Sequence, residues 1–257
     1  MANELKIDAR RKQILEILRR DGQVRVSQLS ELLGATVVTI RSDLDALEQD
    51  GYLERTQGGG IQTMKNYYNL EFQRRKQERM GMKKAIAAAA ADMVQDGDTL
   101  FINSGTTTYF TAVELKKRKN INVVTNSISV AIELGGLPTF RVILLGGDIN
   151  AQYSFTYGED VKEQISRYRA DWAILSVDGI SPGVGLTTYH AEESAIDRIM
   201  MDRARTPLIV ADSTKLGHES FSRISGMNGI DVWITDRNAD PRMVEQITQG
   251  GVKVVFT

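Results

Sequence analysis

The sequence predicts an α/β protein of two domains, a small helical domain followed by a larger domain built on a mostly parallel β-sheet. Residues 8–49 carry three short helical patterns in succession. From residue 83 onward, β-rich runs without polar alternation are separated by helical stretches. Such runs are typical of a parallel sheet covered by helices on both faces. The length of 257 residues also fits one large domain and one small one.

Composition limits the classes of site that the chain can build. The absence of cysteine excludes disulfides, thiolate metal sites and a cysteine nucleophile. The two histidines, His190 and His218, form no HExxH pair, so we expect neither a metal nor a cofactor. The polar N-terminus and the lack of an apolar run of about 20 residues predict a cytoplasmic protein without membrane contact. A net charge of −1 means that any nucleic-acid contact must come from locally placed cations.

The first two helices are expected at residues 8–20 and from Ser27 to Gly34. The first carries several arginines, which are either a solvated face or contacts to a DNA backbone, and the sequence leaves both open. Ser27 is expected to cap the second helix, whose Leu29, Leu32 and Leu33 face inward. Gly34 is expected to end it in the left-handed conformation. The connection to the third helix, 34–36, has the length found in a helix-turn-helix.

The third helix is the candidate recognition helix. Thr36 is its expected N-cap, and Val37, Ile40, Leu44 and Leu47 recur at helical spacing on an inward face. After Gly51, two short strands flank the turn Gln57-Gly58-Gly59-Gly60, which predicts a wing able to approach a phosphate backbone. The sequence therefore predicts a winged helix-turn-helix that binds double-stranded operator DNA. The candidate contacts are Arg25, Thr36, Val38, Thr39, Arg41, Ser42, Arg55, Gln57, Gly58 and Gly59.

The stretch VTIRSDLDALEQDGYLERTQGGG resembles the N-terminal signature of the DeoR family of bacterial sugar-metabolism regulators. That family usually has two basic residues before Asp-Leu and His-Gly-Gly-Ala in the wing. This chain has Arg41-Ser42-Asp43 and Gln57-Gly58-Gly59-Gly60 instead. We therefore expect Ser42 and Gln57 to set the operator preference. The predicted domains are 1–62 for DNA binding, 63–82 as a linker and 83–257 for effector binding, with the basic cluster at 74–84 as solvated surface.

In the larger domain, polar and glycine-rich clusters follow successive predicted strands. Strands are expected at 99–102, 121–125, 141–145, 172–177, 207–211, 232–235 and 252–256. Ligand sites in open parallel sheets lie at the carboxyl ends of the strands. The cluster at residues 103–108 joins a glycine and hydroxyl side chains to a helix N-terminus, which favours anion binding over an ordinary helix cap. No lysine follows in the nucleoside-triphosphate pattern GxxxxGK[ST].

Five such clusters predict one pocket for a phosphorylated polyhydroxy ligand. For His190 the alternative is a surface loop, and for Tyr153 and Phe155 a pocket wall and a subunit interface are both open. The candidate ligand contacts are Asn103, Ser104, Gly105, Thr106, Thr107, Thr108, Asn126, Gly147, Asp178, His190, Glu192 and Lys215.

The stretches NSGTTT, TNS, LLGGD, SVDGI, GLTTYHAEE and ADSTK together resemble the DeoR-family effector domain, which is related in fold to ribose-5-phosphate isomerase and aminosugar-phosphate deaminases. Asn103 departs from the aspartate typical of the family. The resemblance implies a repressor of a carbohydrate-utilisation operon that is released by a phosphorylated sugar. Because operators of this kind are symmetric, we expect a homodimer or homotetramer.

A second hypothesis is a sugar-phosphate isomerase or deaminase-like enzyme with an appended DNA-binding domain. Asp178, Glu192 and Lys215 would then supply proton transfer next to a carbonyl. The stretch 34–60 discriminates between the two, since an isomerase has no use for a recognition helix and a wing. The sequence therefore favours a regulator without enzymatic activity.

Overall fold

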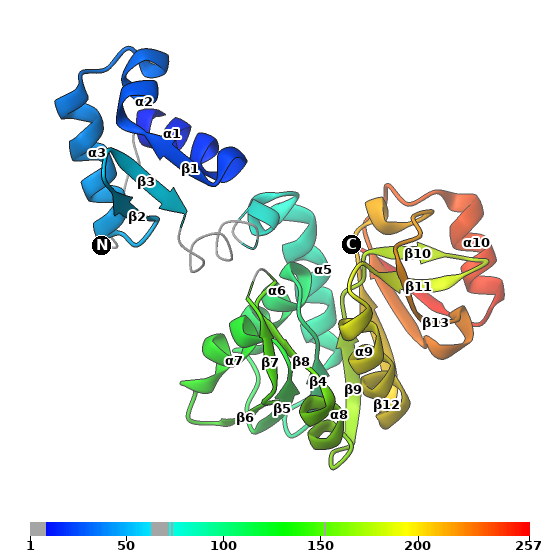
Figure 1. Cartoon of the computed structure of the whole chain (residues 1–257). Coiled ribbons are helices and arrows are strands. Elements are labelled where there is room, and N and C mark those ends of the chain that lie inside the picture. The colour runs from blue at the N-terminus through cyan, green and yellow to red at the C-terminus, as the bar shows by residue number, and fades with distance from the viewer. Residues whose placement is uncertain (1–8, 63–71, 73, 152) are drawn as a thin grey trace. The chain divides into compact units, whose positions relative to one another are not determined.

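The computed structural model describes residues 9–62, 72, 74–151 and 153–257, which belong to two compact units, Met1–Glu71 and Phe72–Thr257 (Figure 1). The predicted linker at 63–82 falls partly outside these residues, and its part from Phe72 onward belongs to the second unit. Within the described residues, no helix is long and apolar enough to cross a membrane.

The first unit has the order helix, strand, helix, helix and hairpin that defines a winged helix-turn-helix, as predicted. Its three strands form one antiparallel sheet in the order β1-β3-β2. The elements are α1 (Ala9–Asp21), β1 (Gln23–Arg25), α2 (Val26–Leu33), α3 (Val37–Gln49), β2 (Leu53–Thr56) and β3 (Gly59–Gln62).

The turn between α2 and α3 follows the predicted capping at two of three positions. Gly34 adopts φ 60°, and the Thr36 hydroxyl accepts a hydrogen bond from the Thr39 amide at 3.2 Å. The prediction for Ser27 was wrong, because α2 begins at Val26 and Arg25 occupies the N-cap position. Two apolar residues were also predicted on the wrong face. Val37 is 42% exposed, because the first turn of α3 projects beyond the core, and Leu32 on α2 is 68% exposed.

The core of this unit joins all three helices through buried aliphatic side chains, among them Ile14, Leu29 and Ile40. One charged group lies beside it. Asp43 on α3 is 2% exposed and accepts hydrogen bonds from Arg10 and Arg11 on α1, the latter at 3.0 Å. These two arginines therefore hold α1 against α3. The sequence had left a solvated face and a DNA contact open for the arginines of this helix, and the structure gives Arg10 and Arg11 a role inside the unit.

The wing has a shorter turn than predicted. Only Gln57 and Gly58 lie in the turn, whereas Gly59 and Gly60 belong to the central strand β3. A Cβ atom on Gly59 would lie 1.9 Å from the Val24 carbonyl oxygen on β1. Glycine at position 59 therefore permits the close approach of β1 and β3.

The second unit is built on a seven-stranded parallel sheet in the order β15-β14-β12-β9-β4-β5-β6. Each predicted run is one of these strands, and three of the seven have the predicted ends. The strands are β4 (Thr99–Ile102), β5 (Ile121–Thr125), β6 (Phe140–Leu144), β9 (Ala170–Leu175), β12 (Ala204–Val210), β14 (Val232–Thr235) and β15 (Lys253–Phe256).

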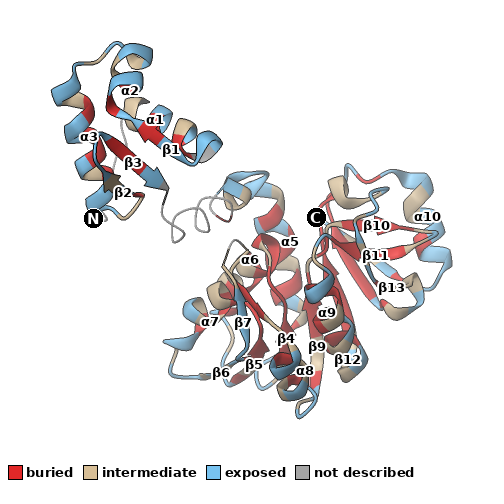
Figure 2. Ribbon diagram, in the orientation of Figure 1, coloured by how far each residue is buried: buried red, intermediate tan, exposed pale blue. Residues whose placement is uncertain are grey.

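Helices cover both faces of the sheet, and the buried residues form two clusters (Figure 2). Alternate residues of β4 separate them: Phe101 packs into one cluster, and Leu100 and Ile102 pack into the other. The helices α8 (Glu159–Ile165), α9 (Ala191–Arg203) and α10 (Pro241–Gln249) contribute to the first cluster. The helices α5 (Met80–Met93), α6 (Thr106–Leu115) and α7 (Ile128–Gly135) contribute to the second.

Two small antiparallel sheets were not predicted, because their strands have only three or four residues and lack a clear apolar pattern. One is the hairpin β7 (Asp148–Asn150) and β8 (Phe155–Tyr157). The other joins β10 (Gly179–Ser181), β11 (Gly185–Thr188) and β13 (Ser222–Ser225). Both follow strands of the large sheet and carry residues next to the site described below.

Candidate functional site

The candidate DNA-contacting residues differ in how free their surfaces are. Most are exposed or half-buried on β1, α3 and its N-cap, and the wing, and Val38 is 75% exposed. Two are occupied within the unit. The Arg55 guanidinium donates to Asp45 at 2.9 Å and to the Gly59 carbonyl at 2.6 Å, and Gly59 itself is buried.

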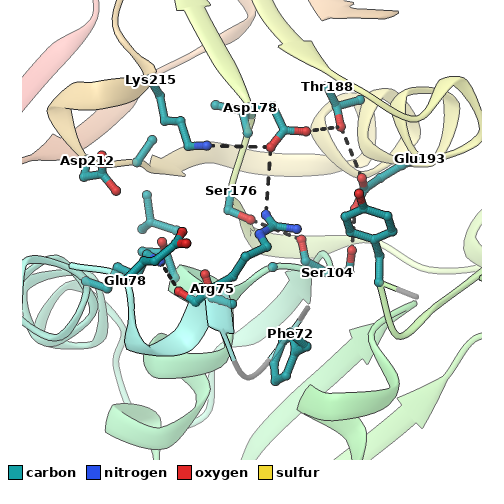
Figure 3. Close-up of a pocket in the computed structure, with 18 of the residues that line it drawn as sticks. Phe72, Arg75, Glu78, Ser104, Ser176, Asp178, Thr188, Glu193, Asp212 and Lys215 are labelled. Atoms are coloured by element: carbon teal, nitrogen blue, oxygen red, sulfur yellow. Dashed lines mark hydrogen bonds and ion pairs between the residues drawn. The ribbon is translucent and has the colours of Figure 1, made fainter. Parts of the chain in front are cut away.

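The candidate ligand pocket lies in the second unit at the carboxyl ends of β4, β9 and β12 (Figure 3). These three strands are neighbours in the sheet. The lining residues are Phe72, Arg75, Glu78, Arg79, Lys83, Ser104, Gly105, Thr106, Thr107, Tyr153, Ser176, Val177, Asp178, Thr188, His190, Glu193, Val210, Ala211, Asp212 and Lys215.

Seven of the twelve predicted ligand residues line this pocket: Ser104, Gly105, Thr106, Thr107, Asp178, His190 and Lys215. The clusters after β5 and β6 do not reach it, which excludes Asn126 and Gly147 from its lining. Strand order explains this, because β5 and β6 lie one and two strands beyond β4, at about 4.8 Å per strand.

Asn103 and Thr108 lie beneath the pocket, where they hold the loop before α6. Both are fully buried. The Asn103 side chain accepts from the Ser176 amide at 3.0 Å and donates to the Ser176 carbonyl at 2.9 Å. The Thr108 hydroxyl contacts the Asn103 and Gly105 carbonyl oxygens, at 3.1 Å in each case. The prediction that they line the pocket was wrong.

Glu192 is likewise misplaced, and its neighbour Glu193 takes the place expected for it. Both stand in the first turn of α9, but Glu192 is exposed whereas Glu193 is 7% exposed and lines the pocket. The Glu193 carboxylate accepts from the Ser104 hydroxyl and, at 3.2 Å, from the Thr188 hydroxyl. Successive helical residues point about 100° apart, so one position decides between the two.

The loop before α6 brings the N-terminus of that helix to the pocket. Gly105 precedes the helix with φ 154°, and a Cβ atom there would lie 2.0 Å from the Ser176 hydroxyl oxygen. The first N–H groups of a helix have no partner inside the helix, and they carry a partial positive charge. Thr106 and Thr107 stand at these positions and line the pocket.

A single carboxylate holds two cations inside the pocket. Asp178 Oδ1 lies 3.8 Å from an Arg75 guanidinium nitrogen and 3.8 Å from Lys215 Nζ (Figure 3). Its Oδ2 accepts from the Tyr189 amide at 3.0 Å and from the Thr188 hydroxyl at 3.1 Å. Burial opposes ionisation of Asp178, but these cations and donors outweigh it and lower the pKa of the carboxyl group.

Two further carboxyl groups are buried beside Asp178. Burial raises the pKa of Glu193 to about 7, and the charge of Asp178 adds to this effect, against the hydrogen bonds from Ser104 and Thr188. Burial and the charge of Glu193 also raise the pKa of Asp197 well above its ordinary value, although Asn103 donates to it. The pocket therefore combines the ionised carboxylate of Asp178 with one acid, Glu193, that can hold a proton near neutral pH.

Lys83 enters the pocket from α5. It is 8% exposed, and its ammonium group donates to the Arg75 carbonyl. Burial lowers the pKa of Lys83 to about 8, and the charge of Asp212 opposes that shift. Because this pKa lies close to neutral pH, an anion bound beside Lys83 would favour its charged form.

His190 presents an unused polar atom. Its Nε2 is buried and has no hydrogen-bond partner, although the ring packs against Tyr153 with centroids 4.3 Å apart. Burial lowers the pKa of His190. Of the two roles left open for Tyr153, lining a pocket is the one that this unit provides.

The contribution of the residues that precede and open α5 was not predicted from sequence. The basic cluster at 74–84 was expected to be solvated surface, but Arg75, Arg79 and Lys83 line the pocket. A signal for Lys83 was present, because it shares a helical face with the buried Ile86, Ala87 and Ala90. No metal-binding group of three acidic or histidine side chains occurs within the described ranges.

Two family models together match most of the chain. A DeoR-like helix-turn-helix domain matches residues 10–64, and a DeoR C-terminal sensor domain matches residues 78–237. The chain belongs to the DeoR family of transcriptional regulators. DeoR-family membership accounts for both units, one that binds DNA and one that senses a ligand.

Several relatives of this DeoR-family protein match it over nearly their full length. The transcriptional repressor GlcR of Bacillus subtilis is 32% identical over 95% of this chain and 94% of its own. The lactose phosphotransferase system repressor of Lactococcus lactis is 31% identical, over 93% and 95%. The glycerol-3-phosphate regulon repressor of Escherichia coli is 28% identical, over 94% and 95%.

Among solved structures, ribose 5-phosphate isomerase of Plasmodium falciparum resembles the chain with a TM-score of 0.40 and 17% identity. The match covers 53% of this chain and 52% of the isomerase.

Proposed function

We propose that this DeoR-family protein represses a carbohydrate-utilisation operon and leaves its operator when a phosphorylated sugar binds the sensor pocket. One observation carries the proposal. A single pocket collects the N-terminus of α6, the cations Arg75 and Lys215, and the carboxyl groups of Asp178 and Glu193. This set of groups suits a ligand that has an anionic end and several hydroxyl groups.

The phosphoryl group would bind at the first turn of α6. Backbone N–H groups at a helix N-terminus bind phosphate without further help, and Lys215 supplies a full positive charge on the same pocket. The hydroxyl groups would donate to Asp178 and Glu193, while the unpaired Nε2 of His190 offers one more polar partner.

The DNA end of the mechanism uses the exposed face of α3 and the turn of the wing. A recognition helix reads base edges in the major groove, and paired half-sites require paired domains, so the proposal includes a homodimer or homotetramer. Relatives named as repressors of a lactose phosphotransferase system and of a glycerol-3-phosphate regulon support carbohydrate control. A regulator of this kind would act in the cytoplasm.

The coupling between ligand and operator needs only about 1–3 kcal/mol, which is a 5- to 150-fold change in DNA affinity. Fluorescence anisotropy with DNA from upstream of the protein's own operon tests it. We expect specific binding that weakens steeply with salt and weakens further with one member of a panel of pentose and hexose phosphates. The proposal is contradicted if the protein binds this DNA no more tightly than unrelated DNA, or if no sugar phosphate in the panel changes its DNA affinity.

A second candidate function, isomerisation of a sugar phosphate, is favoured by one observation. Glu193 lines the pocket with a pKa raised by burial to about 7, which suits a general base. Asp178 is less suited to this role because its pKa is lowered. A coupled assay with ribose 5-phosphate and aminohexose phosphates tests this function, and turnover that is lost in Glu193→Gln would place it first.

A further inference from the structure

The segment at residues 72–79 forms one wall of the pocket, and it is the part of the second unit that leads back along the chain toward the DNA-binding unit. Phe72, Arg75, Glu78 and Arg79 all line the pocket. Figure 3 labels the first three. We call the described residues of 72–79 the connecting segment. Its position raises the question of how a ligand would act on it.

Two sets of contacts hold the connecting segment on the sheet domain. At α6, the Phe72 ring meets the Tyr109 ring edge-on with centroids 5.6 Å apart, and Lys76 Nζ lies 4.0 Å from the Tyr109 centroid. At α5, Lys83 donates to the Arg75 carbonyl. Tyr109 follows the first turn of α6, so the segment packs on the helix whose N-terminus offers the anion site.

Arg75 links the connecting segment to the polar groups of the pocket. Its guanidinium lies 3.8 Å from Asp178 and 5.5 Å from the centroid of the Tyr153 ring. Asp178 also holds Lys215, so a single carboxylate is shared by two cations. The 3.8 Å separation between Arg75 and Asp178 is longer than a charge-assisted hydrogen bond of about 2.7–2.9 Å. Asp178 therefore holds the guanidinium weakly, and a ligand anion can compete with it.

A phosphate group would compete with Asp178 for Arg75. Phosphate carries more charge than a carboxylate, and its oxygens match the planar fork of a guanidinium. Arg75 stands on the connecting segment rather than on the sheet, so a change of its partner moves that segment more easily than it moves a strand.

Building on the proposed function, we propose that Arg75 is the residue that couples ligand binding to DNA release. A phosphorylated ligand at the N-terminus of α6 takes Arg75 from Asp178 and shifts the connecting segment, and this shift weakens the affinity of the protein for its operator. Lys215 remains with the ligand and supplies affinity. Arg75 supplies the coupling.

Hydrogen–deuterium exchange on the full-length protein tests this assignment, with inorganic phosphate and ribose 5-phosphate as probes. The wild type is compared with Arg75→Gln and with Arg74→Gln, a matched control whose side chain is 52% exposed, pairs with Glu78 at 3.4 Å and does not line the pocket. We expect at least one probe to protect the amides of residues 105–108 in all three proteins. Exchange at residues 72–79 should change about fivefold in the wild type and in Arg74→Gln, and less than twofold in Arg75→Gln.

Each outcome separates the two proposals. Protection at residues 105–108 without a change at 72–79 in the wild type overturns the role of Arg75 and leaves the proposed function intact. The role of Arg75 is also overturned if amide exchange at residues 72–79 changes as much in Arg75→Gln as it does in the wild type. Absence of protection at 105–108 in the wild type with either probe contradicts phosphate sensing itself, and the coupling role falls with it.

The second readout is DNA affinity, measured with the sugar phosphate that releases the wild type. For Arg74→Gln, that ligand should change the Kd for operator DNA by the same factor as for the wild type. For Arg75→Gln, it should change this Kd by less than twofold. A wild-type response in Arg75→Gln overturns the inference, whereas indifference of the wild type to all sugar phosphates overturns the proposed function.

Discussion

The side-chain amide of Asn103 donates to both carboxyl oxygens of Asp197, at 3.1 and 3.0 Å, and both side chains are fully buried. The contact joins the end of β4 to the middle of α9, directly below the loop before α6. The resemblance to the DeoR family implies aspartate at this position, where this chain has Asn103. In this chain the amide donates to Asp197 at a point where a second carboxylate would oppose it.

Asn103→Asp should therefore destabilise the protein. Two buried carboxyl groups about 3 Å apart cannot both ionise, and an uncompensated buried charge costs about 3–5 kcal/mol. We expect a loss of about 3 kcal/mol in the free energy of unfolding at pH 8 and a smaller loss at pH 5, where one group holds its proton. Urea denaturation at both pH values measures it.

The matched control for this change is Asn120→Asp, at an exposed position with φ 58°, a conformation that asparagine and aspartate both tolerate. It should alter the free energy of unfolding by less than about 0.5 kcal/mol. Equal stability of Asn103→Asp and the wild type at pH 8 contradicts the pairing described above.

Glu193 should make stability fall as pH rises. Its pKa is about 7 in the folded protein and near 4.5 in the unfolded chain, so the folded state binds more protons between these values. The free energy of unfolding should decrease from pH 5 to pH 7 and level off above it. In Glu193→Gln this decrease should be smaller, because the amide keeps an acceptor for Ser104 and carries no proton to lose. Asp197 accounts for the part that remains.

The pH series needs a control for the other carboxyl groups of the helix. Glu192→Gln changes the neighbouring, exposed carboxyl group and should leave the pH profile of the wild type unchanged. Identical profiles for Glu193→Gln and the wild type contradict the raised pKa of Glu193.

Gly105→Ala should abolish the response to sugar phosphates. A methyl group at this position, with φ 154°, would lie 2.0 Å from the Ser176 hydroxyl oxygen, so the loop before α6 must move. We expect ligand affinity to fall at least tenfold while DNA binding without ligand stays within twofold. Calorimetry and fluorescence anisotropy measure the two quantities.

Gly81→Ala is the control for this substitution. A Cβ atom on Gly81 would have no heavy atom within 4 Å apart from its chain neighbours and the backbone of its own helix, so alanine fits there without displacing any side chain. Its ligand affinity should equal that of the wild type. If Gly105→Ala binds the ligand as tightly as the wild type, the hypothesis that this loop binds the phosphate is contradicted.

Ser42→Arg should change the operator that is preferred. Ser42 is exposed on α3, and an arginine there can bond to both acceptors of a guanine, which is worth about 1–3 kcal/mol of base discrimination. Selection from a randomised DNA library measures the preference, and ligand affinity should not change. An unaltered preference contradicts the placement of Ser42 at the DNA surface.

The seven strands of the parallel sheet could be found from sequence because their apolar runs are continuous and are separated by helical spacing. The short strands of the two small sheets carry no such pattern. At the site, the loop at residues 103–108 was recognisable from its glycine and hydroxyls, yet only its middle residues line the pocket. Sequence periodicity predicts which face of its own helix or strand a residue lies on. It does not predict which other helix or strand packs against that face.

By itself the sequence determined the winged helix-turn-helix, the third helix with its Thr36 cap, the parallel sheet and the edge of that sheet at which the pocket lies. These features depend on local periodicity and capping, which neighbouring residues carry. Only the tertiary structure decided that Glu193 rather than Glu192 enters the pocket, that Asn103 is a buried partner of Asp197, and that Arg75 and Lys83 belong to the site. Those outcomes depend on strand order and on contacts between residues far apart in the chain.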